Sequence, residues 1–413
     1  MKRIILILIT LIVSIALAVA VIYAIVISRD DYYTDKFDQL IPQLMEQYKV
    51  PGVAVSLVQG EVVWSKGYGL ADKKQGVPVA ADTVFQVGSV SKAVTSWGVM
   101  KLVEKGQLDL DAPVEQYLTR WHLPPSSFDA SGVTIRRLLS HNAGLSVPGY
   151  PGMPPDEQLP SLEESLSGKN GGAGKVQIIM EPGTQANYSG GGFTLLQLII
   201  EEVTGETFSA YMQREVLNPL GMIHSSFEWR EDLRPATAVG YNQSGSPYPN
   251  FLFTEQAAAG LYTTAADLAR FVAAEMPGPE GEQAGRGVLA PETLALMIEP
   301  LFDTSPGVAQ GLGQSIATVP DGSKAVFHWG TNRGWQGLIA ANPKWAVGFV
   351  ILTNSDNGSS LNSETMLNLL IPLFIGRILW ILIPVLILAL FICAFFLNKS
   401  LASHRQLMQR SQV

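Results

Sequence analysis

Cysteine is almost absent from this 413-residue chain, in which Cys393, near the C-terminus, is the sole example. The rest of the chain therefore has no disulfide framework and no cysteine chemistry. Long basic tracts are missing too, and the formal net charge is −8, which argues against a nucleic acid as partner. Histidines are few and include no pair at the helical spacing of metal ligands (His122, His141, His224, His328 and His404). The sequence therefore predicts no metal site and no cofactor.

Two familiar catalytic signatures are also missing. No Gly-x-Ser-x-Gly elbow occurs, which weighs against an α/β-hydrolase. The glycine-rich stretch SGKNGGAGK superficially resembles a phosphate-binding loop. It fails as one, because Lys169 stands where the first glycine is needed and Val176 where the hydroxyl is needed. We interpret this stretch as a surface loop.

Charged residues make up only 15% of the chain against 47% hydrophobic residues, and two apolar segments account for this balance. Residues 4–27 and 378–397 are each long enough to cross a hydrocarbon core of about 30 Å as a helix. A cleaved signal peptide is the alternative for the first segment, since Ala16, Ala18 and Ala20 are small. Its apolar run exceeds the roughly 7–15 residues of a signal peptide, so we favour an uncleaved anchor.

The charges that flank these segments predict an orientation. Basic residues lie beyond both outer ends (Lys2, Arg3, Lys399, Arg405 and Arg410), so the positive-inside rule places both termini in the cytoplasm. Arg29 and Arg377, at the inner flanks, argue weakly against this. The predicted organisation is a transmembrane anchor (1–28), an extracytoplasmic domain (31–372), a second transmembrane helix (378–397) and a short cytoplasmic tail (398–413). The localisation is thus the cell membrane.

The domain between the two segments has strands at both ends and helices in the middle. Residues 33–48 predict an amphipathic helix, and GVAVSLVQGEVVWSKGYG predicts a hairpin. AVFHWG, WQGLIAA and AVGFVILTN predict three late strands, and helical stretches follow Ser89 and recur at 194–205 and 264–276. This pattern indicates an α+β fold: an antiparallel sheet flanked by helices, plus a mainly helical subdomain. A cleft is expected where the two meet.

The stretch Ser89-Val90-Ser91-Lys92 opens the first of these helices and has two interpretations. Ser89 is a helix cap if its side chain accepts a backbone N–H. It is a nucleophile if Lys92, one helical turn further on the same face, takes its proton. On the tetrapeptide alone the cap is favoured, because Ser-x-x-Lys is frequent by chance.

Tyr188 could supply a general base. It precedes a strong helix in the order Tyr188-Ser189-Gly190, and a nearby cation would favour its phenolate. A buried tyrosine in a glycine-rich turn is the simpler reading of this residue alone. The triplet SDN at 355–357 resembles another part of such sites, but it follows the last strand and is interpreted as a turn.

The strand end His328-Trp329-Gly330 could line the cleft. Its glycine would let a substrate approach the backbone closely. The backbone N–H of Thr331, with that of Ser89, could form an oxyanion hole. Taken alone, His328 is more simply a half-buried strand histidine.

The order and spacing of these parts resemble the serine β-lactamase-related family, which includes class C β-lactamases, D-alanyl-D-alanine carboxypeptidases and related esterases. The resemblance extends from about Phe37 to Asn357, nearly the whole predicted domain. It rests on these segments in order: FQVGSVSKAV, LVEKGQLDLDAPVEQYL, VTIRRLLSHNAGL, EPGTQANYSGGGF, VLNPLGMIHSSF, AAAGLYTTAADLARF and HWGTNRGW.

The resemblance implies a β-lactamase/transpeptidase-like fold and a role for each matched residue. It implies catalytic roles for Ser89 as acylated nucleophile, Lys92 as its proton acceptor and Tyr188 as general base. Substrate binding is implied for His328, Gly330 and Thr331, and a structural role in the cleft wall for His141. Ser89 is then expected both to cap its helix and to present its hydroxyl.

Two departures from the family pattern bear on the expected activity. Gly190 stands where the family usually has asparagine, and His328 replaces a lysine, so a fixed positive charge is lost or becomes pH-dependent. Both favour an esterase or peptidase over a potent β-lactamase. The expected function is that of a membrane-anchored serine hydrolase acting on an ester, a D-alanyl peptide or a β-lactam. The alternatives are a catalytically silent module that binds cell-wall peptides, and a purely structural membrane protein; the oligomeric state stays open.

Overall fold

The structure, a computed structural model, describes residues 2–27, 32–319, 321–368, 383–392 and 395. They form two compact units: Pro42–Asn362, and the described parts of Met1–Ile41 and Ser363–Val413. Helix α1 spans Lys2–Ile27 in the second unit. Over the described residues, no helix meets both the length and the apolarity that a membrane crossing needs. The predicted first span, 4–27, lies within α1 and is covered by this finding, whereas about half of the predicted second span, 378–397, lies outside the described residues. Membrane anchoring stays a prediction.

The larger unit contains one long antiparallel sheet. Its strand order is β3-β2-β1-β11-β10-β9-β8-β7-β6, so the first long strand lies beside the last. The predicted hairpin and the three late strands are confirmed, whereas β6, β7 and β8 were not predicted. The bounds are β1 (Gly52–Gln59), β2 (Val62–Asp72), β3 (Val77–Pro78), β6 (Phe302–Ser305), β7 (Val308–Gln310), β8 (Ser315–Thr318), β9 (Lys324–Asn332), β10 (Trp335–Asn342) and β11 (Val347–Thr353). A short separate pair joins β4 (Val84–Gln86) to β5 (Tyr262–Thr264).

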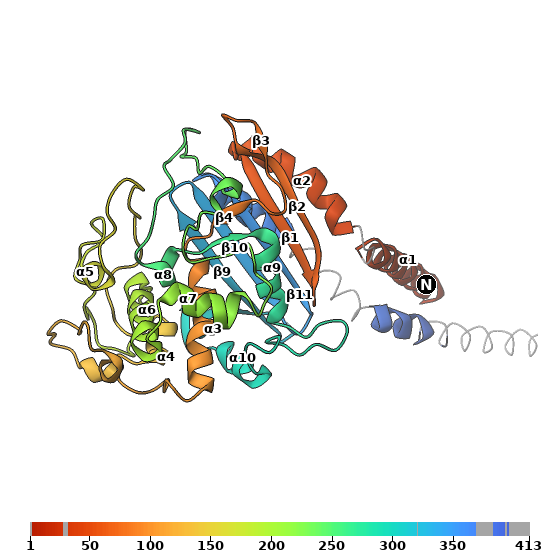
Figure 1. Cartoon of the computed structure of the whole chain (residues 1–413). Helices are drawn as coiled ribbons and strands as arrows, with labels where there is room; N and C mark the ends of the chain where they lie inside the picture. Colours follow the sequence, from red (N-terminus) through yellow and green to blue (C-terminus); the bar gives the residue numbers. More distant parts are fainter. Residues whose placement is uncertain (1, 28–31, 320, 369–382, 393–394, 396–413) are drawn as a thin grey trace, which may run out of the picture. The chain divides into compact units, whose positions relative to one another are not determined.

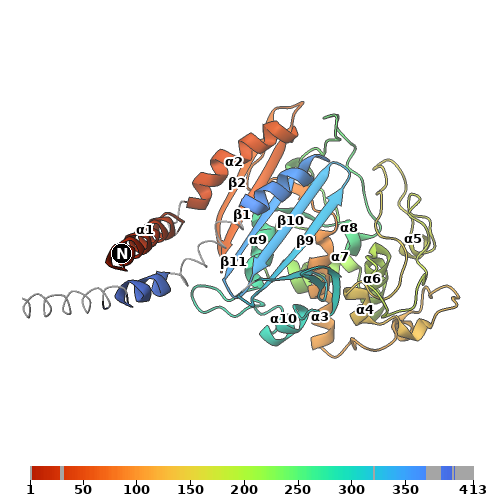
Figure 2. The ribbon, with the colours of Figure 1, turned by 180° about the vertical axis from the view of Figure 1, so that it is seen from behind.

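Two helices pack against one face of this sheet (Figures 1 and 2): α3 (Val90–Glu104) and α9 (Ala265–Ala274). Every residue of α3 from Val90 to Met100 is buried, so this helix lies inside the core rather than on it. Its buried polar groups find partners locally; Thr95, for example, donates its hydroxyl hydrogen to the carbonyl of Ala257. The centre of the fold thus tolerates polar side chains because neighbouring backbone carbonyls accept their hydrogen bonds.

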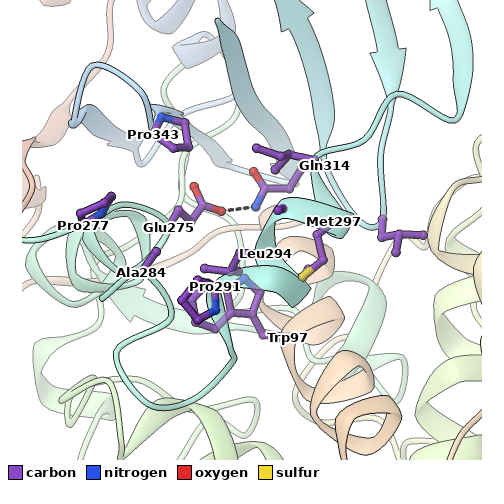
Figure 3. Close-up of a pocket in the computed structure, with 12 residues that line it drawn as sticks. Trp97, Glu275, Pro277, Ala284, Pro291, Leu294, Met297, Gln314 and Pro343 are labelled. Atoms are coloured by element: carbon purple, nitrogen blue, oxygen red, sulfur yellow. Dashed lines mark hydrogen bonds between the residues drawn. The ribbon is translucent and has the colours of Figure 1, made fainter. Parts of the chain in front are cut away.

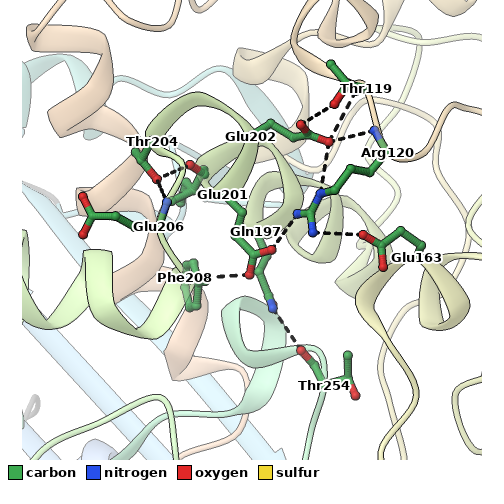
Figure 4. Close-up of polar contacts among 11 residues, drawn as sticks. Thr119, Arg120, Glu163, Gln197, Glu201, Glu202, Thr204, Glu206, Phe208 and Thr254 are labelled. Carbon is green, nitrogen blue, oxygen red and sulfur yellow. Dashed lines mark hydrogen bonds and ion pairs between the residues drawn. The ribbon is translucent and has the colours of Figure 1, made fainter.

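The remaining helices are mostly short and gather beside α3. They are α4 (Ile135–Leu139), α5 (Leu162–Leu166), α6 (Gly190–Thr204), α7 (Phe208–Met212), α8 (Gln256–Ala259) and α10 (Pro291–Met297); the predicted helix at 33–48 is α2 (Tyr32–Tyr48). Arg120 ties part of this region together by pairing with Glu163 of α5 at 3.0 Å and with Glu201 and Glu202 of α6 at 2.7 and 3.3 Å (Figure 4). The α+β architecture with a mainly helical subdomain is therefore as predicted.

Candidate active site

Ser89 lies at the turn that leads from β4 into α3. The turn is tight: Gly88 has φ +50°, and a Cβ there would come 2.6 Å from the backbone nitrogen of Thr331. Ser89 occupies the N-cap position but has helical dihedral angles, and its side chain makes no capping hydrogen bond. The expectation that Ser89 caps its helix was therefore wrong. Its hydroxyl oxygen instead accepts a hydrogen bond from Lys92 Nζ at 3.0 Å.

Lys92 is held in place by two acceptors. Its side chain is only 1% exposed, and Nζ donates to Ser89 Oγ and, at 2.7 Å, to the carbonyl of Ala258 in α8. A buried amine normally loses stability through desolvation, and hydrogen bonds of this kind offset that cost. The side chain consequently has one defined position, with its nitrogen directed at the serine hydroxyl.

Tyr188 lies on the other side of this amine. Lys92 Nζ is 5.1 Å from the centre of the Tyr188 ring and 5.7 Å from that of Phe193, distances typical of cation–π contacts. The Tyr188 ring is 42% exposed, and its hydroxyl has no hydrogen-bond partner among the described residues. The structure thus brings Tyr188 to Lys92 but does not join its phenol oxygen to Ser89.

His328 on β9 completes the surroundings of Lys92. It is 7% exposed, and its Nδ1 lies 2.7 Å from the carbonyl oxygen of Trp329. Burial, helped by the positive charge of Lys92, lowers the pKa of His328 to about 4, although the bond to Trp329 opposes this. His328 is therefore neutral near pH 7 and provides no fixed positive charge there.

The end of β9 fits against the turn that carries Ser89. A Cβ at Gly330 would come 1.9 Å from the carbonyl oxygen of Val87 and 3.0 Å from Ser89 N, so only glycine fits. No hydrogen bond to the Ser89 N–H occurs among the described residues. Since Thr331 also adjoins Gly88, the backbones of both predicted oxyanion-hole residues lie at the same place.

His141, expected to be structural, has a larger part in the site than its sequence position suggested. Its ring lies 4.2 Å from that of Tyr188, centre to centre, and its Nδ1 accepts the Ser189 N–H at 3.2 Å. Burial, with the nearby Lys92 and His328, lowers the pKa of His141 well below its usual value. The neutral ring must then carry its proton on Nε2, which is buried and has no partner. Its positive φ of 56° was not readable from the motif.

Gly190 begins α6 beside Tyr188, and the space a side chain would need is occupied. A Cβ there would come 3.1 Å from the Pro148 carbonyl oxygen and 3.3 Å from the ring of Tyr150. The Tyr150 hydroxyl accepts a hydrogen bond from Thr194 at 2.7 Å, which fixes the ring. The proline-rich loop predicted at residues 147–160 therefore fills the position where the family usually has asparagine.

The structure also shows the SDN triplet that the sequence interprets as a turn. The SDN triplet at 355–357 follows β11 as a turn, in which Asp356 accepts the Gly334 N–H at 2.6 Å. Among the described residues, no group of three or more histidine, cysteine, aspartate or glutamate side chains could hold a metal ion. Ser89, Lys92, Tyr188, His328, Gly330 and Thr331 come together from distant parts of the sequence; their individual roles stay predictions.

A serine hydroxyl bonded to a buried lysine, next to a tyrosine and the end of strand β9, is the arrangement of a class of serine hydrolases. A family model described as Beta-lactamase matches residues 37–371, and the chain belongs to the beta-lactamase family. The predicted resemblance is thereby confirmed.

Individual relatives are more distant. The chain is 30% identical over 257 residues to PbpX of Bacillus subtilis (strain 168), named as a candidate penicillin-binding protein, with 61% of each chain covered. The chain spans about three fifths of the length of the curated relatives it matches. Among solved structures, the octameric penicillin-binding protein homologue from Pyrococcus abyssi has a TM-score of 0.66 at 28% identity, covering 78% of this chain and 74% of that one. D-alanine carboxypeptidase AmpC from Burkholderia cenocepacia, at 24% identity, shares the fold with a TM-score of 0.66 over 82% of this chain and 98% of its own.

Proposed function

We propose that this chain is a membrane-anchored serine hydrolase that forms an acyl-enzyme on Ser89, with its catalytic unit on the extracytoplasmic side. The observation that carries the proposal is the 3.0 Å hydrogen bond between Lys92 Nζ and Ser89 Oγ, in a lysine that is fixed by a second bond to Ala258. The second bond holds the lysine nitrogen next to the serine hydroxyl, where a proton acceptor must lie. The anchor rests on the apolar residues 4–27 and 378–397.

The proposed reaction begins with attack of Ser89 Oγ on the substrate carbonyl carbon. Lys92, as the free amine, takes the hydroxyl proton, directly or through Tyr188, and the carbonyl oxygen becomes an oxyanion. The N–H groups of Ser89 and Thr331 stabilise this charge. The intermediate then expels the leaving group, which takes up the proton, and a water molecule later hydrolyses the acyl-serine to release the acid and restore Ser89.

The substrate is proposed to be an ester in preference to a β-lactam. At neutral pH His328 is uncharged, and Gly190 has no side chain; a Cβ there would lie 3.1 Å from the Pro148 carbonyl oxygen. Two groups that could bind an amide and a carboxylate are therefore missing. An ester needs neither of these two groups as strongly as a β-lactam does. A D-alanyl peptide is the second choice of substrate.

A catalytically silent binding module is the second candidate. The observation in its favour is the Tyr188 hydroxyl, which bonds to none of the described residues. This arrangement suits a site that retains the shape of its family without the complete proton path.

One experiment separates the two candidates. The full-length chain in detergent is treated with a fluorophosphonate and weighed by intact mass spectrometry, alongside Ser89→Ala and the control Ser91→Ala, whose hydroxyl donates to the Gly88 carbonyl. An enzyme gives a single adduct in the native chain and in Ser91→Ala but not in Ser89→Ala. A folded native chain without adduct would reject the enzyme and favour the silent module.

A further inference from the structure

A cavity of about 170 Å³ lies apart from the residues of the Ser89 site (Figure 3). It is formed by the end of α9, the loop that follows it, α10, the segment before β8 and one residue of α3. Most of its walls are apolar, and none of its lining residues is a lysine, arginine or histidine. The lining comprises Trp97, Glu275, Pro277, Ala284, Pro291, Leu294, Ala295, Met297, Ile298, Leu312, Gln314 and Pro343.

Glu275 is the one titratable side chain in this lining. It is 7% exposed, and one carboxyl oxygen accepts a hydrogen bond from Gln314 Nε2, as Figure 3 shows. The second oxygen has no partner among the described residues. Burial raises the pKa of Glu275 to about 8, with the bond from Gln314 acting in the opposite direction. The cavity is therefore lined by a carboxyl group that is mostly protonated at pH 7.

Charged side chains on the neighbouring elements are bound elsewhere. Arg286, on the loop after α9, donates to the carbonyls of Met276 and Gly60. Lys101 of α3 donates to the carbonyl of Val288. Neither provides a counter-ion for Glu275, and the pKa of its carboxyl is accordingly set by burial and by Gln314 alone.

Two more polar groups at the cavity lack partners. Gln314 Oε1 and Trp97 Nε1 are buried and make no hydrogen bond. Buried polar groups without partners are uncommon in folded proteins, and each calls for an explanation. When Glu275 is ionised, one of its oxygens and Gln314 Oε1 can each accept a further hydrogen bond, and the indole of Trp97 borders the same space.

We infer that this cavity binds a small organic primary ammonium ion with a ring-sized apolar body, held by the side chains of Glu275 and Gln314. An ammonium group has three N–H donors, which suit the two oxygens that lack them. A cation also gains from the aromatic ring of Trp97, whereas an anion would find the indole N–H of Trp97 as a donor but would lie against the carboxyl group of Glu275. The volume suits a benzene-sized body, since a cavity of about 150 Å³ holds benzene. On binding, the Glu275 proton passes to solvent, and the carboxylate pairs with the ammonium ion.

The probe for this site is benzylamine, with benzyl alcohol as its uncharged counterpart, titrated calorimetrically into the full-length chain in detergent. Because Glu275 must ionise, the benzylamine affinity is expected to rise about tenfold from pH 6 to 7 and then level off near pH 8. Titrations in buffers of different ionisation enthalpy should show close to one proton released at pH 6. Benzyl alcohol should bind more weakly and without pH dependence.

Two variants test the location. Glu275→Gln keeps a side chain of the same shape and should lose at least about tenfold in benzylamine affinity together with the pH dependence. Ala284→Leu fills the cavity and should abolish binding of both probes. Thermal unfolding checks that each variant is folded, and Ala284→Leu carries the test if Glu275→Gln is not. Absence of benzylamine binding, binding that does not change with pH, or binding that survives Ala284→Leu would each overturn the inference.

Discussion

Lys92 and Glu275 are both buried ionisable side chains close to α3, and the protein accommodates them in opposite ways. Lys92 has two hydrogen-bond acceptors and two aromatic rings around its nitrogen. Glu275 has one amide donor and an otherwise apolar cavity. The first environment provides polar partners for the buried nitrogen, whereas in the second burial raises the pKa of the carboxyl and keeps it protonated. The two sites therefore differ in how many polar partners offset the cost of burial.

The largest effect on activity is expected from removing the amine of Lys92. Lys92→Met should lower the rate of Ser89 acylation by about 1,000-fold, because the serine loses its proton acceptor. The pKa of His328 should rise at the same time, since the neighbouring positive charge is gone. Acylation is followed with a fluorophosphonate, and the histidine by NMR titration.

The control for this prediction lies on the same helix. Lys101→Met removes a lysine that donates to the Val288 carbonyl, away from Ser89, and should leave the acylation rate within about twofold. Equal losses of acylation rate in both variants would mean that Lys92 acts only by stabilising α3. The difference between Lys92 and Glu275 would then have no bearing on catalysis.

The close packing next to Ser89 should tolerate an added methyl group much less well than a nearby position on β10 does. Gly330→Ala would place a methyl group 1.9 Å from the Val87 carbonyl oxygen and should destabilise the fold by about 3 kcal/mol or more, with loss of acylation. Gly337→Ala, at the paired position on β10, has 3.4 Å to the same oxygen and should be tolerated. The free energy of unfolding in urea measures both; similar values would show that the turn yields to accommodate the methyl group.

At acidic pH the buried His328 next to Lys92 should lower the stability of the fold. Because the pKa of His328 is about 4 when folded and near 6.5 when unfolded, the unfolded chain binds more protons between these values. Stability is thus fully present above pH 6.5 and is lost as the pH falls toward 4, by about 3 kcal/mol. His328→Asn should remove this part of the slope in urea unfolding curves from pH 7.5 to 4. A slope identical to that of the native chain would contradict the prediction.

Glu275 in the cavity should give stability the opposite pH dependence, with a loss as the pH rises. The pKa of Glu275 is raised to about 8, so the folded chain binds the extra proton, and stability falls as the pH rises from about 4.5 to 8. Glu275→Gln removes this penalty and should raise the free energy of unfolding by about 4 kcal/mol at pH 8, with little change at pH 4.5. A variant less stable than the native chain at pH 8 would show that the carboxylate already has a partner there.

The sequence was sufficient for most of the fold, and the residues that it singled out around Ser89 lie close together in the structure. Apolar periodicity located α3, α6, α9, the first hairpin and the last three strands. It missed β6, β7 and β8, whose short, mixed segments FDTS, VAQ and SIAT carry no alternation of their own. They are ordered by pairing with one another and, through β8, with β9. Tertiary pairing, which no local pattern records, decided their structure.

Within the site, the errors came from side-chain direction. The Ser-x-x-Lys spacing placed Ser89 and Lys92 on one face, but whether the hydroxyl turns to the backbone or to the amine depends on Ala258, more than 160 positions away. The unpartnered nitrogen of His141 and the cavity at Glu275 arise from several segments at once. Neither feature can be predicted from a sequence motif.

The pairing of β1 with β11 also constrains how the chain can be made. Val53 lies opposite Thr353, 300 positions later, so the hairpin formed by β1 and β2 keeps an open edge of buried-type residues until nearly the whole unit has been synthesised. An open apolar edge is a template for pairing with other chains. Closing such a distant contact is slow. Biogenesis of this protein should therefore depend on a holding factor during synthesis, and truncation before β11 should yield aggregates instead of a smaller folded core.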